Sequence, residues 1–198
     1  MSEQKSSAQR RRRRRADADR SVAAILDASI AILGSRPEAS MEEIATAAGV
    51  ARQTIYAHYP TRQALYDAIL DRITVEVVAA FDAGDLDTRP ADEALRHWLD
   101  ITWSLIERYP VLLNPNLAGN PRDDHDRHEP ISTSLLQLID KGRRDRVFDP
   151  GMPPPWLAVA TIALGHAAGQ QVAAGRMTMR EAGAAYRDSV LRLYGVRP

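Results

Sequence analysis

Residues 40–65, SMEEIATAAGVARQTIYAHYPTRQAL, carry the local signals that most restrict how this chain folds. Ser40 and Glu43 have the spacing of a capping box, in which each side chain accepts a hydrogen bond from the backbone N–H of the other residue. A helix should therefore begin near Met41. Gly49 favours the left-handed backbone conformation that ends a helix, so this first helix is short.

A second short helix is predicted directly after this turn. It can begin at Arg52 and must end before Pro60, because a proline ring clashes with the preceding helical turn and shifts the residue before it away from helical angles. Thr61 can then cap a third helix. Two short helices joined by a tight turn are typical of a helix-turn-helix, which reads DNA with its second helix.

The second helix has two distinct faces. At about 100° per residue, Ile55 and Tyr59 fall on the side that packs on the first helix, and Gln53 and Ala57 fall opposite. Arginine and glutamine can pair with base edges in the major groove, while hydroxyl, imidazole and guanidinium groups suit phosphates. The predicted DNA-binding residues are Ser40, Arg52, Gln53, Thr54, Tyr56, Ala57, His58 and Arg62.

These residues resemble the TetR family of bacterial transcriptional repressors. The shared pattern comprises Ile44-Ala45, Ala48-Gly49-Val50, Thr54-Ile55-Tyr56, His58-Tyr59-Pro60, Thr61-Arg62 and Ala64-Leu65. The resemblance implies that Arg52, Gln53 and Tyr56 meet bases and that Thr54, His58 and Arg62 hold the DNA backbone. Ala51 departs from the pattern, since many members have a serine there to cap the recognition helix.

The charge of the chain is uneven along its length. The 198 residues include 26 basic and 26 acidic side chains, and the chain has no cysteine, which excludes disulfides and thiolate metal sites. Residues 1–62 carry eleven basic and seven acidic side chains, so the N-terminal part favours nucleic acid as a partner. We expect a cytoplasmic protein, because no apolar run approaches the length of a membrane helix or a signal peptide.

The first fifteen residues end in a run of arginines: Arg10, Arg11, Arg12, Arg13, Arg14 and Arg15. Their mutual repulsion and lack of apolar partners predict a disordered basic arm over residues 1–18. Such an arm can place arginines on phosphates or in a minor groove, or it can be a solvated tail that adds only non-specific attraction. A nuclear-localisation signal is a third interpretation of the composition.

Apolar residues at helical spacing predict an all-α chain. We expect a three-helix DNA-binding domain over residues 19–64 and a C-terminal helical ligand-binding and dimerisation domain over residues 65–198. Within the second domain, residues 115–130 are rich in Pro, Asn, Gly and Asp, which predicts a mobile loop. Helices should resume over about 131–142, 156–174 and 178–194.

The last two predicted helices are rich in alanine and glycine, which lets helix axes approach closely. This composition fits packing within one chain. The resemblance implies more, because TetR-like proteins commonly dimerise through their last two helices, and a two-fold dimer places two recognition helices about one turn of DNA apart. We therefore expect a homodimer.

Several side chains of the C-terminal half could line a ligand cavity, although a plain aromatic core explains the same spacing. They are His97, Trp98, Trp103, Tyr109, Met152, Trp156, His166 and Gln170. The segment Asp123–Glu129 contains two histidines and four carboxylates, but a hydrated acidic loop explains it better than a metal site. We find no nucleophile, phosphate loop or metal-binding helix, and we predict no enzyme, no metal and no cofactor.

The sequence thus supports a dimeric TetR-like repressor that binds a palindromic operator on double-stranded DNA and releases it when an unknown small-molecule effector binds. The nearest alternative is a ligand-independent DNA-binding dimer that acts architecturally or answers to a protein partner. A more distant alternative is a catalytic or ligand-binding helical bundle with an incidental helix-turn-helix.

Overall fold

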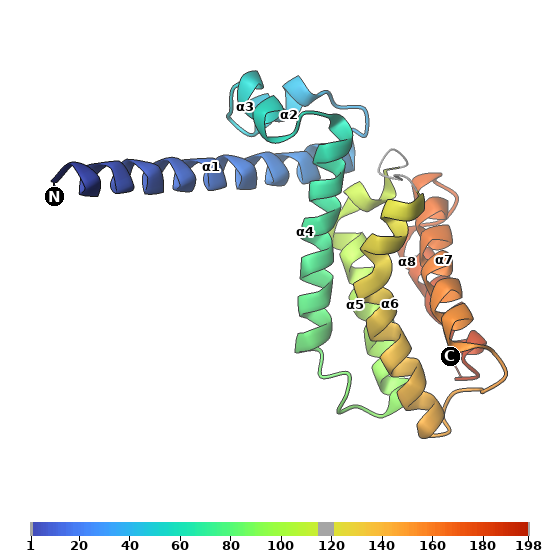
Figure 1. Ribbon diagram of the computed structural model, residues 1–198. Coiled ribbons are helices and arrows are strands. Elements are labelled where there is room, and N and C mark those ends of the chain that lie inside the picture. Colours follow the sequence, from blue (N-terminus) through green and yellow to red (C-terminus); the bar gives the residue numbers. More distant parts are fainter. Residues whose placement is uncertain (1, 115–120, 198) are drawn as a thin grey trace. The chain divides into compact units, whose positions relative to one another are not determined.

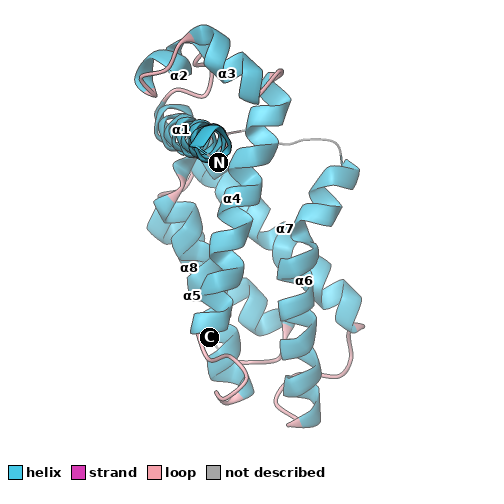
Figure 2. Ribbon diagram, turned by 60° about the vertical axis from the view of Figure 1, so that its left-hand side comes forward, coloured by secondary structure: helices cyan, strands magenta, loops and turns pink. Residues whose placement is uncertain are grey.

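The structure, a computed structural model, describes the backbone of residues 2–114 and 121–197, and their side chains except those of residues 2–11, 13, 14 and 121–127. Every regular element of this described part is a helix, as Figure 2 shows, which agrees with the all-α prediction. No helix within these residues is long and apolar enough to cross a membrane.

The helices follow one another with short connections (Figure 1). They are α1 (Ser2–Ser35), α2 (Met41–Ala47), α3 (Arg52–His58), α4 (Arg62–Ala83), α5 (Ala91–Arg108), the 3-10 helix η1 (Pro110–Leu113), α6 (Pro121–Arg144), α7 (Pro154–Ala173) and α8 (Met179–Leu193). The chain divides into two compact units, Met1–Ile69 and Leu70–Pro198, so the boundary falls inside α4, five residues beyond the predicted one.

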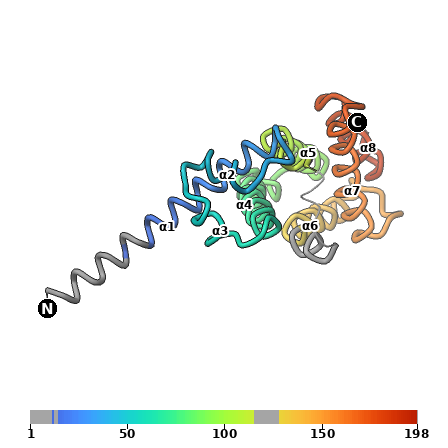
Figure 3. The backbone as a smooth tube through the Cα atoms, turned by 90° about the horizontal axis from the view of Figure 1, so that it is seen from above, coloured from blue at the N-terminus to red at the C-terminus, as the bar shows by residue number. Residues whose placement is uncertain are grey.

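The first unit is a small three-helix domain completed by the first turns of α4. Helix α2 packs against both α1 and α3, an arrangement visible from above in Figure 3. Its core side chains are almost completely buried: Ile25, Leu33, Ile44, Ile55, Leu65 and Ile69 each have 0% exposure. Burying an aliphatic side chain of this size contributes about 1.5–3 kcal/mol, so this core fixes how α3 is presented.

Helix α1 begins at Ser2, whereas the sequence predicted a disordered arm up to residue 18. The arm is made largely of Arg, Ala, Gln and Lys, which are good helix formers, and its backbone continues the helix that the apolar stripe begins. Asp17 and Arg20 form an ion pair on the exposed surface of this helix. The prediction relied on charge repulsion and overlooked helix propensity.

The second unit is built from α5, α6, α7 and α8 with the last part of α4. Its interior contains large side chains with almost no exposure, such as Trp98, Leu99, Leu135, Ile139 and Tyr194. Helices α7 and α8 pack closely, and α5 contacts both α6 and α8. A capping box of Thr178 and Glu181 starts α8, with a 3.2 Å hydrogen bond from the Glu181 N–H to the Thr178 hydroxyl.

The prediction of a loop over residues 115–130 is wrong for residues 121–130. Residues 115–120 lie outside the described residues, but α6 begins at Pro121 and continues through Pro130. A proline is well suited to the first position of a helix, where its missing N–H would have no partner in any case. Pro130 lies inside the helix, so the number of prolines in this segment was a poor guide to where the helix is interrupted.

Candidate nucleic-acid interface

The turn between α2 and α3 sets the direction of the second helix. Gly49 has φ +67°, and the N–H groups of Gly49 and Val50 donate to the carbonyls of Thr46 (3.1 Å) and Ala45 (3.0 Å). This pairing is a Schellman ending, which satisfies the last carbonyls of a helix. Helix α2 begins as predicted, because Ser40 and Glu43 form both bonds of the capping box.

The capping box also perturbs an ionisable group. The backbone N–H of Ser40 donates to Glu43 at 2.8 Å, its hydroxyl contacts the same carboxylate, and Arg36 pairs with it. These donors favour the charged form and lower the pKa of Glu43 below its ordinary value. The Ser40 side chain, which the sequence predicted at the DNA, is thus used to hold α2 in place.

Helix α3 has the two faces that its sequence predicts. Ile55 is completely buried and Tyr59 is 8% exposed, so both anchor the helix to the domain. On the outer side, Arg52, Gln53 and Ala57 are exposed, and the half-buried residues beside them are Thr54, Tyr56 and His58. The helix therefore presents a polar face of a size that a major groove admits, and the roles of its residues at DNA remain predictions.

The guanidinium of Arg62 lies against its own domain. It donates to the carbonyls of Pro37 (2.8 Å) and Ala39 and, through Nε, to the hydroxyl of Tyr66 (2.5 Å). The ring of Tyr66 also lies 5.1 Å from the guanidinium carbon. These contacts tie the start of α4 to the loop before α2, a structural role that sequence reasoning did not foresee.

The arginine arm is described only in part. Arg12 and Arg15 have exposed side chains on α1, and the side chains of Arg10, Arg11, Arg13 and Arg14 lie outside the described residues. The predicted contact of this arm with DNA therefore stays a prediction.

Sequence reasoning missed Glu42, a residue of α2 that contacts two residues of the candidate interface. Its carboxylate is 3.0 Å from the Arg52 guanidinium and accepts a 3.2 Å hydrogen bond from the Tyr56 hydroxyl. A usable signal was present: Glu43 completes the capping box, which leaves the adjacent carboxylate of Glu42 free to reach across the turn.

The eight predicted cavity residues do not gather in one place. Trp98 is 1% exposed and stacks on Phe81 with ring centres 5.3 Å apart, and Trp103 is 6% exposed and packs on Tyr186. At the surface, Met152 is 44% and Trp156 is 56% exposed, and the remaining exposed members are His166 and Gln170. All eight residues lie in the second unit, but some are buried in its core and others are on its surface, so they do not line one cavity.

Tyr109 and His97 also have specific local contacts. The hydroxyl of Tyr109 donates to Glu76 at 2.5 Å, and burial together with this carboxylate raises the pKa of the phenol. His97 is half-buried beside Gly84, where its ring would be 3.2 Å from an added Cβ. Both are packing positions in the second unit.

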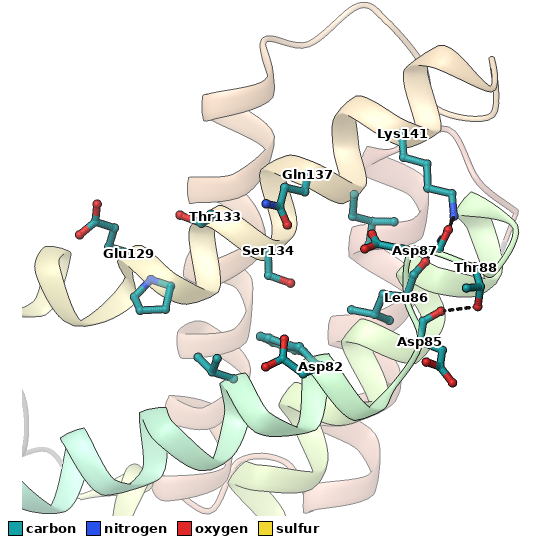
Figure 4. A pocket seen from close by; sticks show the side chains of 14 residues that line it. Asp82, Asp85, Leu86, Asp87, Thr88, Glu129, Thr133, Ser134, Gln137 and Lys141 are labelled. Carbon is teal, nitrogen blue, oxygen red and sulfur yellow. Dashed lines mark hydrogen bonds between the residues drawn. The ribbon is translucent and has the colours of Figure 1, made fainter.

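A pocket of about 670 Å³ lies elsewhere in the second unit, and none of the eight predicted side chains lines it. It lies between the end of α4, the loop before α5, and α6, and Figure 4 shows side chains from these elements facing one another across it. Val78, Phe81 and Leu138 form an apolar wall of the pocket. Four carboxylates also line the pocket, those of Asp82, Asp85, Asp87 and Glu129.

Lys141 is the lysine of this lining, and its amine is committed to the backbone. It donates to the carbonyls of Leu86 (3.3 Å) and Asp87 (2.5 Å) and to that of Arg89. The lysine thereby holds the loop that forms one side of the pocket. The four carboxylates outnumber it, so the pocket is negatively charged.

The acidic segment that the sequence raised as a weak metal candidate is part of α6. The side chains of Asp123, Asp124, His125 and Asp126 lie outside the described residues, and the ring of His128 lies 5.1 Å from that of His166. Among the described side chains, no three His, Cys, Asp or Glu residues are grouped as metal ligands would be.

The comparisons with known proteins agree with this geometry. Residues 25–69 match the family model of bacterial regulatory proteins of the tetR family. The chain is 29% identical over 147 residues to the HTH-type transcriptional repressor LfrR of Mycolicibacterium smegmatis, covering 70% of this chain and 71% of that protein.

Solved structures show the same fold. The crystal structure of the TetR-like regulator LfrR from Mycobacterium smegmatis in complex with proflavine has 26% identity and a TM-score of 0.65, covering 87% of this chain and 94% of that one. Thermus thermophilus FadR, a TetR-family repressor in complex with lauroyl-CoA, has 19% identity and a TM-score of 0.63, covering 87% and 92%.

The helical architecture and the outward-facing α3 define a DNA-binding regulator of the helix-turn-helix class. More narrowly, residues 25–69 match the DNA-binding domain of the tetR family of bacterial regulatory proteins, and most of the chain is similar to TetR-family regulators.

Proposed function

We propose that this protein is a homodimeric transcriptional repressor that binds a palindromic operator through α3 and releases it when a small molecule occupies its C-terminal unit. The observation that carries the proposal is the division of α3 into a buried side, Ile55 and Tyr59, and an exposed polar side, Arg52 and Gln53. A helix presented in this way can enter a major groove, where bidentate side-chain contacts distinguish bases.

A homodimer is supported by an unusual exposed face on α7. Trp156 and Val159 are 56% and 60% exposed, and Ala163 and Ala167 continue the same helical face towards the C-terminal end. Contiguous apolar surface of this kind on a monomer marks an interaction site. A two-fold partner that covers this face, together with α8, would present α3 twice, as a palindromic site requires.

The pocket beside α6 supports control by a small molecule. Its volume falls in the range of ligand sites, and its apolar wall with acidic residues around it suits an organic cation. LfrR was crystallised with proflavine, an organic cation, and the likeness of the two chains makes proflavine a reasonable probe here. A regulator of this kind would act in the cytoplasm, where its operator lies.

The operator can be sought by selecting duplexes that the protein retains from a random pool. The expected result is a palindrome, and we expect Arg52→Ala combined with Tyr56→Ala to abolish its enrichment. Enrichment of no common sequence, with equal retention of all duplexes, would instead favour the ligand-independent architectural dimer.

The effector class can be tested by the melting temperature with two probes. Proflavine should raise it in proportion to ligand concentration, because a ligand that binds the folded state stabilises it. Lauroyl-CoA, which is anionic, should have little effect. Replacing Asp82 and Asp85 by asparagine should remove the response to proflavine. Stabilisation by lauroyl-CoA and not by proflavine would contradict the proposal that the pocket binds an organic cation.

A further inference from the structure

Three side chains form a closed cluster on the surface of the first unit, which we call the Glu42 cluster: Glu42, Arg52 and Tyr56. The Glu42 carboxylate is 3.0 Å from Nη2 of Arg52 and accepts a 3.2 Å hydrogen bond from the Tyr56 hydroxyl. The guanidinium carbon of Arg52 lies 5.5 Å from the centre of the Tyr56 ring. Each member therefore contacts the other two.

Glu42 is not required for the start of α2. The capping box is completed by Glu43, which also pairs with Arg36 at 2.8 Å. The Glu42 side chain instead spans the turn to α3, ten residues along the chain from Arg52. Its contacts are therefore those of the outer face and not those of the helix end.

The cluster is open to solvent and to any duplex that docks on α3. The side chain of Arg52 is 72% exposed and that of Glu42 is 43% exposed. A carboxylate on a surface that meets DNA is repelled by phosphates, and here it also occupies donors that base edges or phosphates would otherwise engage.

We infer, resting on the proposed function, that Glu42 is an affinity-setting residue that competes with DNA, chiefly for Arg52. In the free protein the carboxylate holds the guanidinium and the phenol of the Glu42 cluster. When DNA binds, acceptors on the duplex displace it from Arg52, and the broken ion pair weakens operator binding. In the free protein, Glu42 thus occupies the position that an acceptor of the DNA would take in the complex.

A regulator controlled by a ligand has use for such a residue. Coupling between an effector site and a second site changes affinity by about 5–150-fold in most proteins. If the repressor bound its operator far more tightly than its cellular concentration requires, the operator would stay occupied even after the effector had lowered the affinity by this factor. A competing carboxylate holds the affinity within the range that an effector can reverse.

The test is the dissociation constant of the full-length protein for a selected duplex and for a random duplex, at about 0.1 M salt. Glu42→Gln keeps the size of the side chain and removes the charge. It should tighten binding to both duplexes by about five-fold, the upper range for an exposed ion pair, and the gain should shrink as salt rises. Glu42→Ala should tighten binding in the same way.

Glu38→Gln is the matched control. Glu38 is an exposed carboxylate of the same domain, on the loop between α1 and α2 and outside the Glu42 cluster. Its replacement removes the same charge and should change both dissociation constants by less than about two-fold, since it lies outside the ion pair. Equal gains from Glu38→Gln and Glu42→Gln would overturn the proposal, because they would reflect net charge alone.

Competition for Arg52 is tested by repeating the substitution in Arg52→Ala. The gain from Glu42→Gln should then fall below about two-fold, since the two effects are coupled through one contact. An undiminished gain would contradict the proposal, and so would weaker binding by Glu42→Gln, which would show that the carboxylate supports the complex. If the wild type shows no preferred duplex, the proposed function fails; if it does and Glu42→Gln has no effect, only this inference fails.

Discussion

At the scale of single residues, the structure separates side chains that face outward from those used within the domain. Arg52 and Gln53 are exposed, whereas Arg62 and Ser40 hydrogen-bond to their own chain. The sequence pattern places all four near the same surface, but it does not contain the carbonyl positions of Pro37 and Ala39. Those depend on how the loop before α2 folds back, which no local periodicity encodes.

The role of Arg62 is therefore tested by stability and not by DNA binding alone. Arg62→Ala removes donors from two carbonyls and from Tyr66, and we expect the first unit to lose about 1–2 kcal/mol of unfolding free energy. Arg52→Ala, at an exposed position, should change it by less than about 0.5 kcal/mol. Urea denaturation followed by circular dichroism measures both, and equal losses would contradict the assignment.

At the scale of elements, local signals predicted the helices well where a cap or a proline set the boundary. Ser40 with Glu43 starts α2 at the predicted position, and α8 begins at Met179, close to the predicted residue 178. The starts of α1 and α6 were not predicted, because the run of arginines was taken as a sign of disorder and the prolines as a sign of a loop. The pocket was also missed, since it depends on which faces of α4 and α6 meet.

The two capping boxes predict a dependence of stability on pH. Hydrogen bonds from Ser40 and from Thr178 lower the pKa values of Glu43 and Glu181 in the folded state below the ordinary value of a glutamate. A carboxyl whose pKa is lowered by folding stabilises the protein above its unfolded pKa, and this contribution disappears as pH falls through the folded value. Glu43→Gln and Glu181→Gln should each lower the melting temperature at pH 7 and change it less at about pH 3. Thermal melts at both pH values test this, and an equal loss at both would contradict it.

Two helical glycines provide a matched test of packing in the second unit. A Cβ on Gly183 would lie 2.4 Å from Nε1 of Trp103, whereas one on Gly165 would lie 3.5 Å from the Tyr186 ring, an ordinary contact. Gly183→Ala should therefore lower the melting temperature. Gly165→Ala should raise it slightly, because alanine favours a helix by up to about 1 kcal/mol over glycine. The same sign for both changes would contradict the packing of α8 on α5.

At the scale of the whole molecule, the account depends on assembly. One short helix discriminates weakly, since each bidentate base contact is worth about 1–3 kcal/mol, so two copies are needed for a specific site. The exposed Trp156 and Val159 of α7 are the residues we expect the partner to cover. The family resemblance implied that the last two helices take part in the dimer, but the exposed face of α7 could be recognised only from the fold.

Disruption of that face should separate the subunits without unfolding them. Trp156→Glu combined with Val159→Glu places charges at two exposed positions, so the helical circular dichroism should be unchanged while sedimentation shows a monomer. Operator affinity should fall by at least about 100-fold, because the second half-site no longer adds to binding. Ala174→Glu, at an exposed residue after α7, is the control and should remain dimeric. A wild-type monomer would contradict the proposed assembly.

The most direct test of the central claim is a hydroxyl-radical footprint of the wild-type protein on a selected duplex. The account predicts two protected segments related by two-fold symmetry, with centres about 34–36 Å apart, and loss of both in Arg52→Ala combined with Tyr56→Ala. A single protected segment, or a footprint that the two substitutions leave unchanged, would contradict the claim that α3 reads DNA twice per assembly.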